Sequence, residues 1–368
     1  MKIGILTLDY ITNYGGILQT LALQNYLTEM NYEVEIIHFR RTKKTSRKKR
    51  LWYLFGNIIS GRTPIKRFFE KKPYNTKGVD SKKLIERNRL FIEQYLKRST
   101  LTDEDNIGNL CKKYDCVVVG SDQIWSVTDG EYLTYFFDWK FDGKKIAYAA
   151  CSVNPLPSFF NRKKIAGLLA DFDAISVRDE TTLSFCNKSL YTRDYHLVVD
   201  PTFLYDFSYF HFENKFDFDY IFVYILGSEI CGGNKAAIEQ LKKIYKCEKV
   251  VSVIIPSVST TGTIGADIII CDATPNEWLN LIRHAKAVFT DSFHGCVFSM
   301  KYNVPLIAYY SLSYRASRLL DLKKRFSVRT IISSVEEIPS EAECFVYNRK
   351  ELANAITDSK QFMLNSLK

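Results

Sequence analysis

His294 is the residue of this sequence best placed for acid–base chemistry. It lies where an apolar stretch typical of a buried strand, 287–290, ends and an apolar helix begins. In open α/β sheets ligands collect at the carboxyl ends of strands, because free N–H groups and the dipole of the next helix favour anions there. A histidine at this place can transfer protons near neutral pH and contact a negatively charged substrate. The alternative interpretation is that His294 only caps the helix or packs in the core.

Three other loops leave the carboxyl ends of expected strands, and their candidate ligand contacts are Asn13, Gly15 and Gly16, then Ser121 and Asp122, and finally Arg178. The glycines would let the backbone approach a ligand closely, although a tight turn explains them as well. Asp122 could orient a hydroxyl, act as a base or be a helix N-cap. The guanidinium of Arg178 suits two-point binding of a carboxylate or phosphate, unless it pairs with Asp179 or Glu180.

Several familiar motifs are absent from the sequence. It contains no G-x-G-x-x-G, no P-loop and no H-E-x-x-H, so nothing favours dinucleotide, Mg-ATP or zinc-protease chemistry. The nine cysteines include no C-x-x-C pair, which favours reduced thiols over disulfides or a zinc site. We therefore expect neither a metal nor a resident cofactor.

A chain of 368 residues suits two domains, and 46% hydrophobic with 25% charged residues is typical of a folded, soluble protein. Strands and helices alternate in two successive series. They predict an N-terminal α/β domain at 1–197 with a basic insertion at 40–78, a C-terminal α/β domain at 198–345 that carries His294, and a C-terminal helix at 346–368 that packs back on the first domain. We expect two doubly wound, Rossmann-like domains facing a cleft.

The positive charge of the chain is concentrated in one segment. Residues 40–72 contain thirteen Lys or Arg and one acid, whereas the rest carries 38 basic and 40 acidic side chains. Aromatic residues are interleaved with these charges, namely Trp52, Tyr53, Phe55, Phe68 and Phe69. The combination suits an interfacial segment on an anionic membrane, at about 1 kcal/mol per charge near the surface. The alternative is a solvated insertion, and nothing outside the segment supports binding of nucleic acid.

No run of eighteen or more apolar residues is present, and the N-terminus opens as a strand rather than as a signal peptide. We therefore expect a cytoplasmic protein, or one that binds a membrane peripherally at its inner face.

Five stretches, in this order, resemble the polysaccharide pyruvyl transferase family: 13–23, 118–125, 175–180, Val199-Asp-Pro-Thr202 and 290–295. The resemblance runs from about residue 1 to 325. It implies a two-domain fold of the glycosyltransferase B kind. It also implies transfer of the enolpyruvyl unit of phosphoenolpyruvate to hydroxyls of a sugar, leaving a cyclic pyruvate ketal on a bacterial surface polysaccharide or its lipid-linked precursor.

The resemblance also assigns roles to single residues. It implies that His294 is the general acid and that Arg178 contacts the phosphate or carboxylate of the donor, with Ser292 and Gly295 also at the donor site. Better-studied members have an arginine where this chain has Ser292. The residues that could replace that anion contact are Lys301, Arg315 and Arg318. We favour Arg318, because a serine-arginine pair recurs there in members that share the serine-phenylalanine-histidine variant.

The expected reaction needs one positioned acid, which typically raises the rate by a factor of about 10²–10⁴. It also needs arginines that hold a donor with up to three negative charges. The partners would be phosphoenolpyruvate, a sugar acceptor and an anionic membrane surface. Two alternatives stay open at this point. One is a glycosyltransferase of the same architecture that uses a nucleotide sugar, and the other is a non-catalytic scaffold of polysaccharide assembly.

Overall fold

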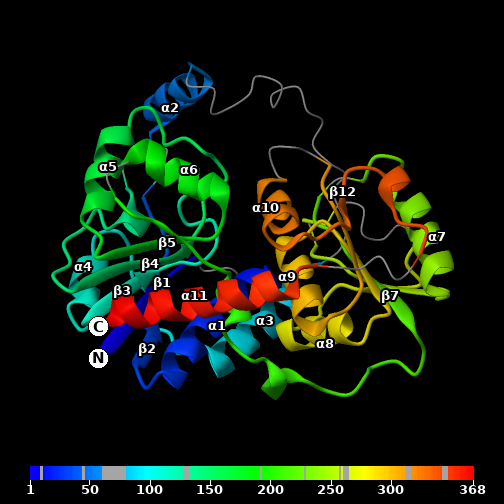
Figure 1. Ribbon diagram of the computed structural model, residues 1–368. Helices are drawn as coiled ribbons and strands as arrows, with labels where there is room; N and C mark the ends of the chain where they lie inside the picture. The colour runs from blue at the N-terminus through cyan, green and yellow to red at the C-terminus, as the bar shows by residue number, and fades with distance from the viewer. Residues whose placement is uncertain are drawn as a thin grey trace.

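Two parallel six-stranded sheets form the framework of the protein (Figure 1). The computed structural model describes residues 1–8, 11–43, 46–59, 80–126, 132–190, 193–227, 229–256, 258–259, 265–311, 316–341 and 347–368. The first sheet has the order β2-β1-β3-β4-β5-β6, and the second has the order β12-β11-β10-β7-β8-β9. The predicted α/β class, with two doubly wound, Rossmann-like halves, is confirmed.

The strands of the first sheet are β1 (Lys2–Leu6), β2 (Glu33–Ile36), β3 (Cys116–Val119), β4 (Lys144–Ala150), β5 (Ala174–Val177) and β6 (His196–Leu197). Those of the second are β7 (Tyr220–Tyr224), β8 (Lys249–Val253), β9 (Ile268–Ile270), β10 (Ala287–Thr290), β11 (Leu306–Tyr309) and β12 (Ile331–Ile332). The inner strands β3, β7 and β10 are buried along their whole length, because helices cover both faces of each sheet.

The helices are α1 (Tyr14–Glu29), α2 (Arg47–Ile59), α3 (Lys82–Tyr95), α4 (Ile107–Cys111), α5 (Arg162–Ala170), α6 (Glu180–Ser189), α7 (Asn234–Tyr245), α8 (Pro275–Arg283), α9 (Phe293–Tyr302), α10 (Ser317–Phe326) and α11 (Arg349–Leu367). Apolar side chains of α4, α5 and α6 share a core on one face of the first sheet. Those of α1, α3 and α11 lie on its other face, in a core that continues into α8, α9 and α10 of the second half. Helix α7 covers the far face of the second sheet.

The order in which successive strands are added reverses at one point in each sheet. This switch point lies between β1 and β3 in the first sheet and between β7 and β10 in the second. Ligands of doubly wound folds bind outside the carboxyl ends of the strands at such a point. Helix α1 follows β1 directly, and α9 follows β10. The loops predicted to contact ligands therefore come from the two switch points and from strand β5.

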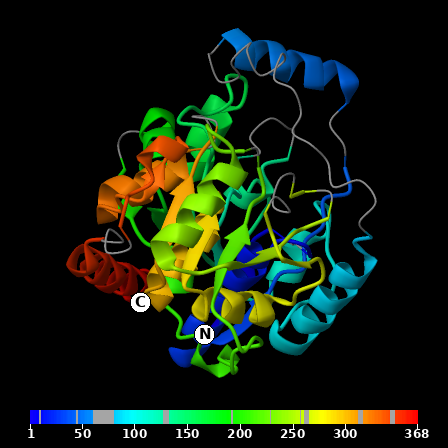
Figure 2. The ribbon, with the colours of Figure 1, turned by 90° about the vertical axis from the view of Figure 1, so that its right-hand side faces the viewer.

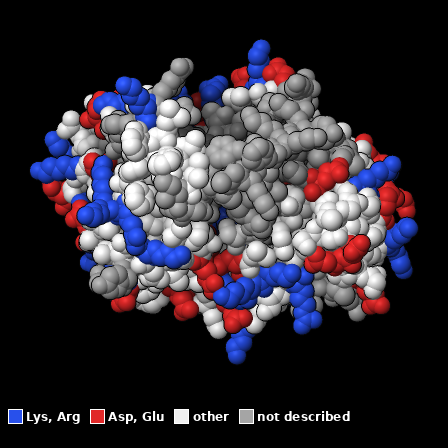
Figure 3. Space-filling model, turned by 90° about the horizontal axis from the view of Figure 1, so that it is seen from above, with Lys and Arg blue, Asp and Glu red and all other residues white. Residues whose placement is uncertain are grey.

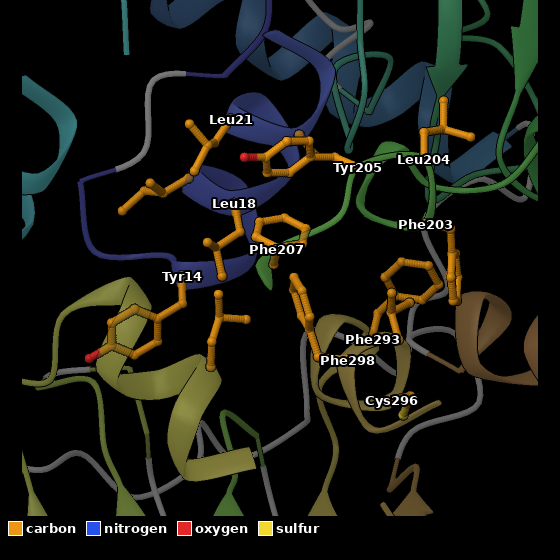
Figure 4. Close-up of a cluster of buried hydrophobic side chains, with 14 of the residues drawn as sticks. Tyr14, Leu18, Leu21, Phe203, Leu204, Tyr205, Phe207, Phe293, Cys296 and Phe298 are labelled. Carbon is orange, nitrogen blue, oxygen red and sulfur yellow. The ribbon is translucent and has the colours of Figure 1, made fainter. Parts of the chain in front are cut away.

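The two halves are in direct contact rather than separated by an open cleft. The ring of Tyr14 on α1 stacks on Trp278 of α8, with centroids 5.6 Å apart. Figure 4 shows side chains of α1, of the segment around Phe203–Phe207 and of α9 gathered into one apolar cluster between the halves.

Polar contacts join the halves on two sides. On one side, Arg325 of α10 donates to the carbonyls of Arg178 and Val198, at 3.0 and 3.2 Å. On the other, Arg87 of α3 donates to Glu277 at 2.8 Å. With the apolar cluster between them, these contacts hold the halves in a closed arrangement.

The C-terminal helix α11 lies along the first sheet (Figure 1). Ser359 accepts a hydrogen bond from the N–H of Val199 at 2.9 Å, and Phe362 contacts the rings of Tyr148 and His196. The end of the chain thus returns to the half in which it began.

Five elements were not anticipated from the sequence: α2, β6, β9, α10 and β12. The three strands have only two or three residues each, too few to show a periodicity. Among the described helices, none combines the length and the apolar character that crossing a membrane requires.

Candidate active site

Asp200 is the centre of a buried polar cluster that follows strand β6. Its Oδ2 accepts a hydrogen bond from Nη1 of Arg178 at 2.6 Å and lies 3.5 Å from Nε2 of His294. Its Oδ1 accepts from the hydroxyl and the N–H of Thr202, at 2.7 and 3.1 Å. Asp200 caps a short 3₁₀ helix that begins with Pro201, so the local sequence fixes the direction of the carboxylate.

Arg178, directly after β5, connects three parts of the site. Besides Asp200 it contacts Oδ1 of Asp122 at 3.3 Å, and its guanidinium lies over the ring of Phe293, 4.4 Å from the centroid. The alternative that Arg178 pairs with Asp179 or Glu180 is wrong. Asp179 caps α6 by accepting from the N–H of Thr182, and Glu180 pairs with Lys324. The guanidinium is thus directed into the site.

His294 lies in the first turn of α9 and contacts the other half of the molecule. The cap of this helix is Ser292, whose hydroxyl accepts from the N–H of Gly295 at 3.3 Å, so His294 is not the cap. Its Nε2 is buried, faces Asp200 and makes no hydrogen bond of ordinary length. A Cβ at Gly15 would lie 2.1 Å from Nδ1 of His294, so the ring packs directly on the glycine backbone.

Burial and opposite charges together set the electrostatics of the cluster. Asp200 is 1% exposed, Arg178 2% and His294 5%. Burial acts to raise the pKa of Asp200, but the neighbouring His294 and Arg178 lower it further than burial raises it, and the net pKa is well below its usual range. Asp200 is therefore a carboxylate that holds two potential cations in place.

The loops of the first switch point reach the same place. Asn13 caps α1 by accepting from the N–H of Gly16 at 3.1 Å, which sets the turn that carries Gly15 to His294. Ser121 is fully buried, and its hydroxyl donates to the carbonyl of Ala149 at 3.0 Å and lies 3.5 Å from Oδ2 of Asp200. The structure thus brings all three predicted loops around His294.

Arg318 on α10 approaches from the second half. Its guanidinium lies over the same Phe293 ring as that of Arg178, 5.7 Å from the centroid. With the amide of Gln123 turned so that its oxygen faces Arg318, the oxygen accepts from Nη2 and Nε at 3.0 and 3.3 Å. Two arginines from different halves therefore meet at one aromatic side chain.

Lys301 and Arg315 are the other two residues considered as replacements for the missing arginine. Lys301 is about two turns further along α9 than His294, next to Phe207, and burial lowers its pKa to about 8. Arg315 lies outside the described residues.

Gly295 and Asp291 fix the position of the start of α9, the helix that Ser292 caps. A Cβ at Gly295 would lie 2.7 Å from the hydroxyl of Thr290, so only glycine fits between α9 and the end of β10. The neighbouring Asp291 accepts from the N–H groups of Leu226 and Gly227, at 2.7 and 2.6 Å, and ties β10 to β7 at the second switch point. These contacts fix the start of α9 and with it His294.

Sequence reasoning gave no role to Asp200 or Phe293. Asp200 lies in one of the stretches that carry the family resemblance, but its partners Arg178 and His294 are distant in sequence. In the sequence Phe293 is one apolar residue among many. Its place between the guanidinium groups of Arg178 and Arg318 is visible only in the structure. The described residues contain no group of three or more His, Cys, Asp and Glu side chains that could hold a metal ion.

A cavity of about 280 Å³ lies at the carboxyl edge of the first sheet, and its lining contains none of the site residues described above. Its lining includes Leu8 after β1, Arg40 and Arg41 after β2, Ile124 just beyond Asp122, and aromatic side chains, among them Phe39 and Tyr135. A second cavity of about 290 Å³ lies between α8 and the segment that precedes β7, away from His294.

Comparison with known proteins identifies relatives at two levels. Solved structures with a similar fold include UDP-GlcNAc 2-epimerases from Neisseria meningitidis (12% identity, TM-score 0.48, 99% of this chain and 100% of that chain) and Rickettsia bellii (10%, 0.49, 100% and 96%). They also include UGT89C1 from Arabidopsis thaliana complexed with UDP-L-rhamnose (12%, 0.47, 98% and 94%). No curated protein sequence matches the chain. At these identities and scores we infer no substrate from the solved structures.

The model of one protein family matches far more specifically. The polysaccharide pyruvyl transferase model covers residues 13–313, which contain the α1 turn, Arg178, Asp200 and His294. The chain belongs to the polysaccharide pyruvyl transferase family.

Proposed function

We propose that this protein transfers the enolpyruvyl group of phosphoenolpyruvate to hydroxyls of a sugar and forms a pyruvate ketal. The observation that carries the proposal is the meeting of a buried imidazole with two guanidinium groups around Phe293. This arrangement supplies one proton donor and two anion contacts, the set that a small, highly charged enol phosphate requires.

In the proposed reaction His294 gives the proton on Nε2 to the methylene carbon of phosphoenolpyruvate. The double-bond electrons form the new C–H bond, and positive charge develops on the second carbon. A sugar hydroxyl attacks that carbon and loses its proton to the imidazole. Phosphate then leaves with its bonding electron pair. A neighbouring hydroxyl attacks the same carbon, closes the ketal and gives its proton to the departing phosphate. The products are the ketal and inorganic phosphate, so the balance needs no oxidant, no reductant and no resident cofactor.

Arg178 and Arg318 would hold the donor. A guanidinium suits the binding of a carboxylate or phosphate. Nε of Arg178 is buried and has no hydrogen-bond partner, so this arginine retains one donor for a ligand. Ser292 occupies the position of the arginine in other members, and Arg318 brings its charge to the same ring from α10.

Entry of the donor requires the halves to separate. His294 packs on Gly15 and Arg178 on Phe293, and in both pairs the partners come from different halves. Opening along this contact would admit phosphoenolpyruvate, and closure would exclude water from the cation that forms.

The acceptor would be a lipid-linked sugar at the cytoplasmic face of a membrane. The cavity beside Ile124 opens at the edge that carries Asp122 and Arg178, and it offers aromatic rings and arginines to a sugar and a phosphate. The basic stretch from Arg40 to Lys72 begins at this cavity, which suits a substrate anchored in an anionic membrane.

The decisive experiment is incubation of the full chain with phosphoenolpyruvate and a panel of lipid-linked and short soluble sugars. We expect release of inorganic phosphate together with a gain of mass on one acceptor. Binding of a nucleotide sugar in preference to phosphoenolpyruvate would contradict the proposal and indicate a glycosyltransferase. Binding of phosphoenolpyruvate without turnover on any acceptor would indicate a scaffold.

A further inference from the structure

An exposed aromatic surface at the top of the molecule is the strongest unexplained feature outside the site. Helix α2 stands above the rest of the fold in both ribbon views (Figures 1 and 2). Its outward side chains are Leu51, Trp52 and Phe55, which are 67%, 63% and 57% exposed. Phe55 follows Leu51 by four residues and Trp52 by three, so the three side chains share one face of the helix.

A second element extends this surface. The loop after β4 presents Phe159, which is 60% exposed, and Phe160 beside it. The ring of Phe160 lies 6.1 Å from that of Trp52, and a Cβ at Gly56 would come within 2.5 Å of it. Helix α2 is therefore docked on Phe160 through a glycine, with its large apolar side chains facing away from the protein.

We name the side chains of Leu51, Trp52, Phe55, Phe159 and Phe160 the aromatic cap. Figure 3, which looks down on this face, shows an uncharged area over α2 with Lys and Arg side chains beside it. The residues from 40 to 72, which include α2, contain thirteen Lys or Arg and one acid. Exposed apolar side chains on a stretch with this excess of basic residues match an anionic lipid surface rather than a neutral protein partner.

The aromatic cap lies at the same edge of the fold as the candidate active site. Helix α2 follows β2 and the Phe159 loop follows β4, whereas Asp122 and Arg178 follow β3 and β5. The carboxyl ends of parallel strands lie at one edge of a sheet, so the aromatic cap and the candidate active site lie at the same edge.

The geometry points to the aromatic cap as a membrane-docking surface, which inserts its aromatic side chains between anionic lipids while the basic segment binds their headgroups. This inference rests on the proposed function in one respect: membrane binding would present a lipid-linked acceptor to the site. The binding itself needs no turnover.

The test measures binding of the full chain to vesicles of phosphatidylglycerol and phosphatidylcholine in equal parts, and to vesicles of phosphatidylcholine alone. We expect binding to the first only, weakening as salt rises. Phe159→Ser leaves the charge unchanged and lies outside the basic segment. It should lower vesicle affinity about tenfold or more, because one aromatic insertion is lost. Trp52→Ser should act in the same direction.

Leu90→Ser is the matched control, since Leu90 on α3 is an exposed apolar residue outside the cap and its change should leave vesicle binding as in the parent. All variants should keep the parent thermal unfolding midpoint and phosphate release with a short soluble acceptor. If Phe159→Ser binds vesicles like the parent, the docking surface is refuted. If the parent chain forms a dimer in solution and Phe159→Ser dissociates it with vesicle binding unchanged, the inference is also refuted and the cap is a contact with a second copy. Vesicle binding without pyruvyl transfer would refute only the proposed function.

Discussion

The two halves of the molecule contribute to the candidate site in different ways. From the first half come Asp122, Arg178 and Asp200, whose charges are paired with one another by hydrogen bonds in the interior. From the second half comes His294, whose Nε2 is buried without a hydrogen bond of ordinary length. Buried polar atoms are nearly always satisfied, and in the proposed function this Nε2, like Nε of Arg178, is left to contact the substrate. The first half builds a fixed charged frame, and the second supplies the group that can exchange a proton.

Replacing His294 tests the second half and should have the largest effect on turnover. His294→Gln removes the proton donor and should lower kcat by about 10²–10⁴, the range of a general acid, with little change in the unfolding midpoint. His284→Gln is the control, because that histidine lies at the end of α8 and contacts the carbonyl of Phe212. Near-normal turnover of His294→Gln would remove it from the mechanism.

Asp200→Asn tests the first half and should act mainly on stability. It leaves the buried Arg178 without its principal counter-charge, which should lower the free energy of unfolding by about 3–5 kcal/mol. The control Asp142→Asn changes an exposed carboxylate paired loosely with Lys140 and should cost less than about 0.5 kcal/mol. Chemical denaturation of both variants gives the comparison. A stable Asp200→Asn protein would mean that the charged frame is not what holds this half together.

Gly15→Ala tests the contact between the halves. The added methyl group would overlap His294, so either the imidazole moves or the halves stay apart. A displacement of about 1 Å at the reacting group should lower turnover on the order of a hundredfold. Gly167→Ala on α5 is the matched control, because no atom lies within 4 Å of the place that its Cβ would take and alanine favours the helix. Equal turnover of the two variants would show that the contact with Gly15 is dispensable.

Arg178→Lys should give the smallest effect and refine the role of the frame. Lysine keeps the charge but cannot contact Asp200, Asp122 and a donor at once, so KM for phosphoenolpyruvate should rise roughly tenfold. Arg162→Lys, which changes an exposed arginine on α5, serves as the control. Steady-state kinetics separates the outcomes, since a fall in kcat at unchanged KM would make Arg178 a support for His294 rather than a donor contact.

Much of the fold was predictable because its signals are local. The apolar runs of β3 and β10 and the capping box that starts α8 each arise from a few neighbouring residues, and the structure contains them. The motif residues were predictable for the same reason, since Asn13, Ser121, Arg178 and His294 each follow an expected strand.

The partners of these residues were not predictable from the sequence. Arg178 has two acids next to it in the chain, yet it pairs with Asp200 and Asp122, because Asp179 is used by the α6 cap and Glu180 by Lys324. The aromatic cap shows the same limit, since Phe160 meets Trp52 across more than a hundred residues of chain. Contacts of this kind depend on how the strands are ordered and how the halves close.

The sequence by itself determined most of the strands and helices and the residues at their ends, because propensity, periodicity and capping act over a few residues. Only the tertiary structure decided that Gly15 packs on His294, that two arginines meet at Phe293, and that Asp200 links both halves of the site. The physical reason is that a buried charge takes its partner from whatever the packed core brings within reach, and that choice is made by the packing of whole elements.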